Sequence, residues 1–270
     1  MGEKIGLIAG NGQFPLIFAQ AAIKEGHQVM AVAHKGETKP ELEKYVKEIQ
    51  WIRVGQLGKL IKFFQKAGVK KVVLAGGIKK RRLFTEIFPD FKAISLLSRL
   101  KNKHDDVVLR AIAEELEKEG LKIYPSTLYA PSLLAPEGCL TKRVPTKEEK
   151  REIEFGWKIA RDIGRLDIGQ CVVVKRQIVV AVEAVEGTDE TIRRGGKLAK
   201  EGAVVIKISK PQQDLRFDVP AVGVDTINTM QEVKASVLAI EAGKTLMFDR
   251  EKMLDAADKA GISVVSLRWP

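Results

Sequence analysis

Residues 4–34 read KIGLIAGNGQFPLIFAQAAIKEGHQVMAVAH, and this stretch decides the fold of the first half of the chain. The apolar run Lys4–Ala9 predicts a β-strand, and a glycine turn separates it from Phe14–Lys24, whose apolar residues have helical spacing. Gly26 stands where a helix commonly ends, and residues 28–33 predict a second strand. The order strand, helix, strand is a β-α-β unit, whose connection is expected to be right-handed.

The alternation of strands and helices continues to the middle of the chain. Further elements are predicted in the order strand, helix, strand, helix and strand at residues 49–54, 57–67, 72–75, 105–119 and 122–124. Strands that alternate with helices favour a parallel, doubly wound sheet. Residues 1–130 are therefore predicted to form a Rossmann-like nucleotide-binding domain.

The periodicity stops between residues 126 and 146, where the stretch YAPSLLAPEGCLTKRVPT contains three prolines. We predict a linker over residues 131–145 and a C-terminal α/β domain over residues 146–270. In this domain, helices are expected at 147–163, 188–200, 228–241 and 250–260, and strands at 171–175, 178–183, 203–208, 245–248 and 263–267. The predicted fold class is α/β, with an N-terminal Rossmann-like parallel-sheet domain followed by a C-terminal α/β domain.

The composition restricts the classes of function. The 270 residues carry a net charge of +11, which implies an anionic partner but does not choose among nucleic acid, phosphates and an acidic membrane surface. No apolar run reaches the ~20 residues that span a bilayer, and no signal peptide is recognised, so a cytoplasmic protein is expected. The two cysteines and three scattered histidines have no metal-ligand spacing.

The glycine turn after the first strand is the first candidate site. It consists of Gly10, Asn11, Gly12 and Gln13. Backbone N–H groups between a strand and a helix can bind a phosphate. The match to G-x-G-x-x-G is partial because Pro15 replaces the third glycine, and His34 stands near the place of the acidic residue that would bind a ribose. The turn predicts a nucleotide site that suits NAD poorly, with a tight turn that binds nothing as the alternative.

A second glycine pair, Gly76 and Gly77, follows the fourth predicted strand, with Lys79 close behind. The carboxyl ends of parallel strands share one edge, so these residues are expected beside the first glycine turn. Asp105 and Asp106 begin a helix, and they either cap it or face the same crevice. We therefore add Gly76, Gly77, Lys79 and Asp106 to the predicted nucleotide site.

The second candidate site begins near residue 183. Glu183 stands inside a strongly apolar strand, so its carboxylate needs a partner such as a lysine, an arginine or a metal. Glu186, Gly187, Thr188 and Asp189 follow it. Thr188 and Asp189 are also ordinary residues for a helix N-terminus, which is the structural alternative to a binding role.

A loop rich in charge and proline lies further on, in KISKPQQDLRFDVPAVGVDT at residues 207–226. Asp214 and Asp218 are oxygen donors that suit Mg²⁺. The cations Lys207, Lys210 and Arg216 suit phosphates. This inventory supports metal-assisted attack on a phosphorus atom, with a set of surface salt bridges as the alternative. Asp225 follows the loop and is expected to start the next helix.

At these motifs the sequence resembles the LpxI-type UDP-2,3-diacylglucosamine pyrophosphatases of lipid A biosynthesis, over essentially the whole chain. The residues that carry the resemblance are 9–15, 76–77, 105–106, 183–189 and 210–220. The resemblance implies Mg²⁺-dependent hydrolysis to UMP and 2,3-diacylglucosamine 1-phosphate, with water attacking the α-phosphorus. It implies Asp218 first and Asp214 second as catalytic and metal-binding residues. Whether Asp105 or Asp106 touches the nucleotide is left open.

The resemblance also implies separate binding roles for the two domains. The N-terminal domain helps to hold the nucleotide, and the C-terminal domain holds the acylated sugar. The substrate-binding residues would be Glu183, Glu186, Gly187, Thr188, Asp189, Lys207, Lys210, Gln213 and Arg216. A peripheral protein on the inner face of the inner membrane is implied, with a lipid-linked UDP-sugar as substrate and no nucleic acid; a homodimer is left open.

Two other classes of protein remain as alternatives. A nicotinamide-dependent dehydrogenase is permitted by the β-α-β unit, although Pro15 and the missing ribose-binding acid count against it. A basic nucleic-acid-binding protein is favoured by the net charge. The aromatic content of 6% and the absence of a recognised motif count against that class.

Overall fold

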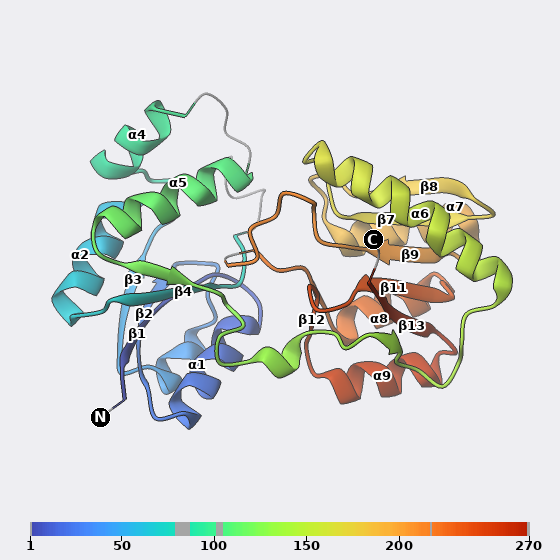
Figure 1. Ribbon diagram of the computed structural model, residues 1–270, viewed down its shortest axis with the longest axis horizontal. Coiled ribbons are helices and arrows are strands. Elements are labelled where there is room, and N and C mark those ends of the chain that lie inside the picture. Colours follow the sequence, from blue (N-terminus) through green and yellow to red (C-terminus); the bar gives the residue numbers. More distant parts are fainter. Residues whose placement is uncertain (1, 79–86, 101–104, 217, 269–270) are drawn as a thin grey trace. The chain divides into compact units, whose positions relative to one another are not determined.

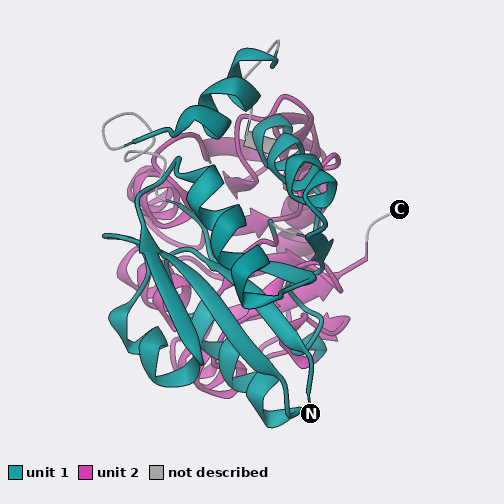
Figure 2. Cartoon of the chain, turned by 90° about the vertical axis from the view of Figure 1, so that its left-hand side faces the viewer, with its two compact units in different colours: residues 1–131, 214–218 teal, residues 132–213, 219–270 magenta. Residues whose placement is uncertain are grey.

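The computed structural model describes residues 2–78, 87–100, 105–216 and 218–268, without the side chains of Asp105 and Asp106. The chain divides into two compact units, which Figure 2 shows in different colours. Unit 1 comprises residues 1–131 and 214–218, and unit 2 comprises residues 132–213 and 219–270. Each unit has its own sheet, so the two are described separately below.

Unit 1 is built on a five-stranded parallel sheet with the strand order β3-β2-β1-β4-β5. The strands are β1 (Lys4–Ala9), β2 (Gln28–His34), β3 (Glu48–Ile52), β4 (Lys71–Ala75) and β5 (Lys122–Tyr124). The predicted Rossmann-like parallel sheet is confirmed. Its order reverses between β1 and β4, which is the switch point where such sheets bind their ligands.

Helices cover both faces of this sheet (Figure 1). They are α1 (Phe14–Lys24), α2 (Leu57–Ala67), α4 (Phe91–Ser98) and α5 (Asp105–Lys118), with a 3-10 helix, η1, at Pro40–Tyr45. α1 packs on one face, while α2, α4 and α5 share a core with the other face through Phe64, Ala93 and Leu116. The sequence analysis missed α4, which has only eight residues and buries only Ala93.

Unit 2 is built on a six-stranded mixed sheet with the strand order β6-β13-β11-β9-β7-β8. Its strands are β6 (Gly138–Cys139), β7 (Cys171–Lys175), β8 (Ile178–Val182), β9 (Val204–Lys207), β11 (Val237–Glu241) and β13 (Ser263–Leu267). A separate pair joins β10 (Ala221–Val222) to β12 (Leu246–Met247). Because β7 is antiparallel to both β8 and β9, the carboxyl ends of β8, β9, β11 and β13 lie at one edge.

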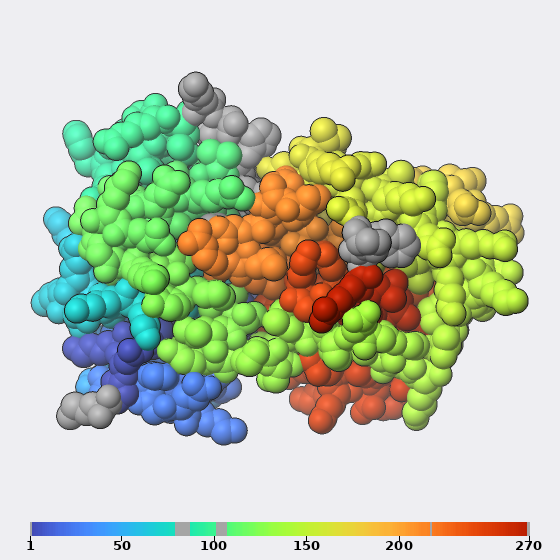
Figure 3. Space-filling view, in the orientation of Figure 1, coloured from blue at the N-terminus to red at the C-terminus, as the bar shows by residue number. Residues whose placement is uncertain are grey.

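The helices of unit 2 also form two layers around their sheet. α6 (Lys147–Arg165) packs on one face and buries Trp157, and its outer side lies on the surface in yellow-green in Figure 3. The other face is covered by α7 (Thr188–Ala199), α8 (Val224–Glu232) and α9 (Arg250–Lys259). The C-terminal α/β fold is therefore confirmed. Among the described residues, no helix combines the length and the apolarity of a membrane span.

One predicted element is wrong. The helix expected at residues 228–241 is divided, because α8 ends at Glu232 and β11 begins at Val237. Lys234 has a φ of +52°, a left-handed conformation that ends the helix without a glycine or a proline to mark it. The apolar run at Val237–Glu241 is then a fully paired central strand between β9 and β13.

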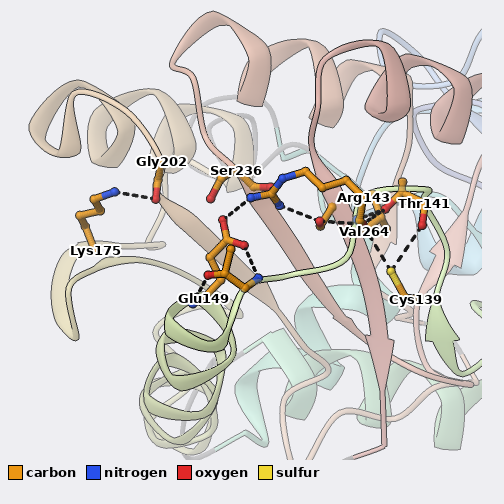
Figure 4. A network of polar contacts seen from close by, with 10 residues as sticks. Cys139, Thr141, Arg143, Glu149, Lys175, Gly202, Ser236 and Val264 are labelled. Atoms are coloured by element: carbon orange, nitrogen blue, oxygen red, sulfur yellow. Dashed lines mark hydrogen bonds and ion pairs between the residues drawn. The ribbon is translucent and has the colours of Figure 1, made fainter.

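The segment before α6 is held to the sheet by a polar network (Figure 4). Arg143 donates through Nη1 to the Ser236 carbonyl at 3.2 Å and to Ser263 Oγ at 2.7 Å, and through Nη2 to Glu149 Oε1 at 2.7 Å. Glu149 also completes a capping box with Thr146 at the start of α6. The predicted linker residues 131–145 thus include η2 (Pro131–Leu133), β6 and this anchored segment.

We predict that Arg143→Met lowers the free energy of unfolding by about 1–3 kcal/mol, because three acceptors would lose a charged donor. Arg165→Met is the matched control, since Arg165 makes an exposed ion pair with Asp162 and should cost less than about 1 kcal/mol. Urea unfolding of both variants measures the difference. Equal losses would contradict the anchoring role of Arg143.

Candidate functional site

The two glycine turns of unit 1 are bonded to each other at the switch point of the sheet. The Gly10 N–H donates to the Ala75 carbonyl and the Asn11 N–H donates to the Gly77 carbonyl, both at 2.8 Å. The structure therefore places Gly10, Asn11, Gly76 and Gly77 side by side, where sequence reasoning expected them. The two turns form one continuous backbone surface at the carboxyl edge of β1 and β4.

The four glycines of these turns have different physical reasons to be glycine. A Cβ on Gly10 would lie 2.3 Å from the Gly77 carbonyl oxygen, and one on Gly76 would lie 2.2 Å from the Asn11 carbonyl oxygen. Among the described residues, nothing lies within 4 Å of such a Cβ on Gly12 or Gly77; of these two glycines, Gly12 has a positive φ, of +84°. Turn packing thus explains Gly10 and Gly76, whereas Gly12 and Gly77 border open space that a ligand could enter.

Side chains at and after the end of β2 hold the last residue of β1, where the first glycine turn begins. The Ala9 carbonyl accepts hydrogen bonds from Thr38 Oγ1 at 2.7 Å and from His34 Nδ1 at 2.9 Å. Burial lowers the pKa of His34 below its ordinary value of 6.5, so the neutral imidazole is the form that fits this site. His34 therefore stabilises the turn and does not take the place of the ribose-binding acid.

A buried acid that the sequence analysis missed lies beside the turn. Glu37 Oε2 accepts from Asn11 Nδ2 at 3.0 Å, which fixes the orientation of the Asn11 side chain. Glu37 follows the last residue of β2 by three positions, in the tight turn Gly36-Glu37-Thr38. The sequence reasoning looked for an acid only at the end of the strand, where His34 stands.

Gln13, Lys79 and Asp106 complete the predicted nucleotide site. Gln13 is the N-cap residue of α1, which has neither a side-chain cap nor an acidic residue in its first turn. Pro15 has no N–H, and the N–H groups of Leu16 and Ile17 donate to the Gln13 carbonyl at 3.0 and 3.1 Å, so the first turn of α1 satisfies its own donors. Lys79 lies outside the described residues, and Asp106 is placed only as the second residue of α5.

In unit 2, Glu183 follows β8 at the carboxyl edge of the sheet and is buried. Its Oε2 accepts from the Gln170 N–H at 3.1 Å, and its Oε1 accepts from Thr188 Oγ1 at 3.0 Å. The sequence reasoning expected a cation or a metal as partner, and the described partners are neutral donors. Both donors also join the ends of connecting segments to the sheet, so Glu183 organises this edge.

The β8–α7 connection uses the neighbouring predicted residues in its own folding. Glu186 accepts from the Ala184 N–H at 3.2 Å and pairs with Arg194 at 2.5 Å. Gly187 is the N-cap residue of α7, with a φ of +87°. Asp189 lies in the first turn of α7, where a negative charge is favourable.

Lys207 ends β9 as a buried ammonium group. Its Nζ donates to the Ala221 carbonyl at 2.7 Å, and among the described residues no carboxylate lies within ion-pair distance of it. It lies next to Cys171 on the neighbouring strand β7. Burial raises the pKa of the Cys171 thiol, so this cysteine is an inert core residue.

The loop after β9 is anchored at several points before it reaches the two aspartates. Lys210 Nζ pairs with Asp167 Oδ1 at 2.6 Å, and both side chains are largely buried. Gln213 Oε1 accepts from the Lys210 N–H at 2.8 Å, and Gln212 Nε2 donates to the Gly164 carbonyl at 2.7 Å. Asp167, which has a φ of +56°, was not singled out from the sequence, where it reads as an ordinary residue after a helix.

Asp214, Arg216 and Asp218 form a tight turn that groups with unit 1. Arg216 Nε and Nη2 donate to Asp214 at 3.0 and 2.8 Å, and this arginine lowers the pKa of the Asp214 carboxyl. The Asp218 N–H donates to the Asp214 carbonyl at 3.2 Å, which brings the two aspartates onto one turn.

The turn offers Mg²⁺ the carboxylates of Asp214 and Asp218. Among the residues that the structure describes, no group of three or more histidine, cysteine or acidic side chains is placed to hold a metal. Mg²⁺ is commonly held by one or two carboxylates together with substrate phosphates, and Asp214 with Asp218 fits that pattern. Arg216 engages both oxygens of Asp214, so a metal at Asp214 would share that carboxylate with the arginine.

The fold and the site define a class: a two-unit α/β protein with paired glycine turns at the switch point of a Rossmann-like sheet and a charged, anchored loop in its second half. Family models described as the LpxI N-terminal domain and the LpxI C-terminal domain match residues 4–133 and 136–265. The chain belongs to the LpxI family.

A curated relative and solved structures complete the comparison. The UDP-2,3-diacylglucosamine pyrophosphatase LpxI of Caulobacter vibrioides is 34% identical, over 98% of each chain. An N5-carboxyaminoimidazole ribonucleotide synthetase from Thermotoga maritima has a TM-score of 0.28 at 16% identity, covering 67% of this chain and 40% of its own. The biotin carboxylase subunit of pyruvate carboxylase has a TM-score of 0.28 at 13% identity, covering 69% and 39%.

The contacts of the glycine turns generate a prediction. Gly10→Ala should lower the free energy of unfolding by about 1–3 kcal/mol, because its methyl group would overlap the backbone of the second turn. Gly77→Ala is the matched control and should stay within about 0.5 kcal/mol of the wild type. Urea unfolding measures both, and a Gly10→Ala protein as stable as Gly77→Ala would contradict the packing.

Proposed function

We propose that this protein hydrolyses UDP-2,3-diacylglucosamine to UMP and 2,3-diacylglucosamine 1-phosphate in lipid A biosynthesis. The observation that carries the proposal is 34% identity, over 98% of each chain, to a relative named as a UDP-2,3-diacylglucosamine pyrophosphatase. The matches of both LpxI domains to the chain support the same activity.

The nucleotide is proposed to bind at the paired glycine turns. Among the described residues, Gly12 and Gly77 border open space there, at the carboxyl edge of the sheet where such folds bind their ligands. Asn11, held by Glu37, would present its side chain beside the same space. These features leave room for a ligand at the switch point, and they are independent of the family relationship.

The charged turn is proposed to serve the chemical step. Water adds its oxygen to the α-phosphorus, which bears the uridine, and the bond from this phosphorus to the bridging oxygen breaks. The bridging oxygen leaves with the β-phosphate as the sugar 1-phosphate, and the protons of the water pass to the phosphate products or to the solvent. Mg²⁺ held by Asp218, with Asp214, would stabilise the negative charge that develops on the attacked group.

The chain's own cations have defined tasks in this proposal. Lys210 is held by Asp167 and Arg216 by Asp214, so both cations are already oriented before a substrate arrives. Preoriented charges stabilise a transition state without being rearranged during the reaction. The lipid-linked substrate further leads us to propose a cytoplasmic protein at the inner face of the inner membrane.

The direct test is phosphorus NMR of the products formed by the purified protein from UDP-2,3-diacylglucosamine. UMP and the sugar 1-phosphate are expected, and water enriched in heavy oxygen should label the UMP. No turnover, or release of UDP with a free sugar, would remove the proposed activity. Label in the sugar phosphate would move the attack to the β-phosphorus.

Metal removal gives the next prediction. Treatment with EDTA should abolish turnover, and added Mg²⁺ should restore it, because one or two carboxylates need the metal to compensate the charge of the phosphates. Product formation measured before chelation, after it and after restoration is the assay. A protein that keeps full activity after thorough chelation would take the metal out of the proposal.

Asp218, which lies inside the loop, and Asp225, which follows it, should differ in their effect on turnover. Asp218→Ala should lower kcat by at least about a hundredfold, the low end for losing one preorganised electrostatic contact. Asp225→Ala is the control, since Asp225 lies exposed in the first turn of α8 and should cost at most about 1 kcal/mol of stability. Loss of turnover in Asp225→Ala with normal turnover in Asp218→Ala would reverse the assignment.

A further inference from the structure

Unit 1 exposes a group of large apolar side chains in and before α4. Phe91 is 93% exposed, Ile94 53%, Phe88 48% and Ile87 39%, and we call these four residues the α4 apolar face. Phe91 and Ile94 are three positions apart, so they share one side of the helix. Single exposed apolar residues are common on proteins, but four within eight positions mark a surface that meets something other than water.

The α4 apolar face is exposed because hydrogen bonds fix the start of α4, and not because the helix end is frayed. Asp90 is the N-cap of α4, and its carboxylate accepts from the Ala93 N–H at 3.0 Å and from the Gly58 N–H of α2 at 2.7 Å. The Asp90 N–H donates to the Gly55 carbonyl at 3.1 Å. Ala93 is buried in the core, so the opposite side of α4, with Phe91, is held outward.

Cationic groups surround this apolar face. The Arg53 guanidinium lies 4.2 Å from the centre of the Phe88 ring. α2 packs against α4 and exposes Lys59, Lys62 and Lys66, whose spacing places them on one side of the helix. Among the described residues, none of these three lysines has an ion-pair partner.

The acidic groups nearby are already engaged. The Asp90 carboxylate is occupied by backbone N–H groups, and Glu115 and Glu119 of the neighbouring segment pair with Lys92. The five cations Arg53, Lys59, Lys62, Lys66 and Lys92 outnumber the three carboxylates of Asp90, Glu115 and Glu119, so the charge of these groups together is positive. Apolar side chains among unpaired cations are the composition that binds an anionic lipid surface.

The face also lies near the proposed nucleotide site within unit 1. Its residues lie over the loop after β3, as the hydrogen bond from Phe88 to the Val54 carbonyl shows at 2.9 Å. β3 is separated from β1 by β2 alone, so this edge lies about 10 Å from the strand that leads to the glycine turn. α4 lies at the surface of unit 1 in Figure 3.

We propose that the α4 apolar face docks unit 1 onto an anionic bilayer, with Phe91 and Ile94 among the lipids and the α2 lysines at the phosphates. A second copy of the chain fits this surface less well, because a symmetric interface would bring the same unpaired lysines together. The proposal rests on the proposed function only in that a lipid-linked substrate would bring the protein to a membrane. Vesicle binding itself can be measured without any substrate.

The test is sedimentation with vesicles of phosphatidylcholine alone or mixed with phosphatidylglycerol. The wild-type chain should bind the mixed vesicles, and Phe91→Ser/Ile94→Ser should lower the partition coefficient by at least about tenfold. The matched control is Ile178→Ser/Leu198→Ser, which removes aliphatic side chains that are 63% and 66% exposed in unit 2. This control should bind as the wild type does.

A charge series separates the electrostatic contribution. Lys59→Gln/Lys62→Gln/Lys66→Gln should weaken binding more than Lys150→Gln/Lys158→Gln/Lys197→Gln, which makes the same change of net charge with exposed lysines of unit 2. Added salt should weaken the binding of the wild type. Equal losses in the two triple variants would reduce the effect to net charge and overturn the proposed surface.

The remaining outcomes are also decisive. The proposal fails if the wild-type chain does not bind the mixed vesicles, or if Phe91→Ser/Ile94→Ser binds them normally. It also fails if that variant turns a dimer into a monomer in light scattering while vesicle binding is unchanged, because the face would then join two copies. If the protein binds vesicles through this face but shows no turnover, the proposed activity fails and the docking surface stands.

Discussion

The contact between the two glycine turns is the constraint on which unit 1 depends. Gly10 and Gly76 meet backbone to backbone, and the hydrogen bonds from Gly10 and Asn11 close the gap between β1 and β4. A side chain at either glycine would push the turns apart and open the sheet at its switch point. The position of the candidate site is therefore set by packing, and among the described residues open space remains beside Gly12 and Gly77.

The support beneath this contact explains why part of the site could not be predicted. Parallel topology alone places the carboxyl ends of β1 and β4 side by side, so the meeting of the two turns followed from the sequence. The roles of His34, Thr38 and Glu37 did not, because they depend on how the chain folds back after β2. Glu37 lies three positions beyond the strand, and no sequence pattern indicates that its carboxylate would bind the Asn11 side chain.

Local signals decide which elements the sequence predicts well. The capping box of Thr146 and Glu149 marks the start of α6, and the positive φ of Arg176 and Gln177 belongs to the predicted hairpin turn. The helix predicted across residues 228–241 fails because Lys234 supplies the break in a left-handed conformation that glycine or asparagine usually signals. The sequence analysis missed α4 because Phe91 and Ile94 face outward, whereas apolar residues of a surface helix usually face the core.

In the charged loop between β9 and β10, several side chains that look like ligand-binding groups in the sequence stabilise the fold. Lys207 and Ala221 stand at the two ends of the loop that carries Asp214 and Asp218, and the Lys207 ammonium joins them by its hydrogen bond to the Ala221 carbonyl. Joining the ends of a long loop removes much of its conformational freedom, which would otherwise have to be lost when the two aspartates are positioned. Burying an ammonium group that has only a carbonyl as partner costs free energy. The closure of this loop offsets that cost. Sequence reasoning assigned Lys207 to the substrate because its charge is visible in the sequence, whereas the carbonyl that it binds is not.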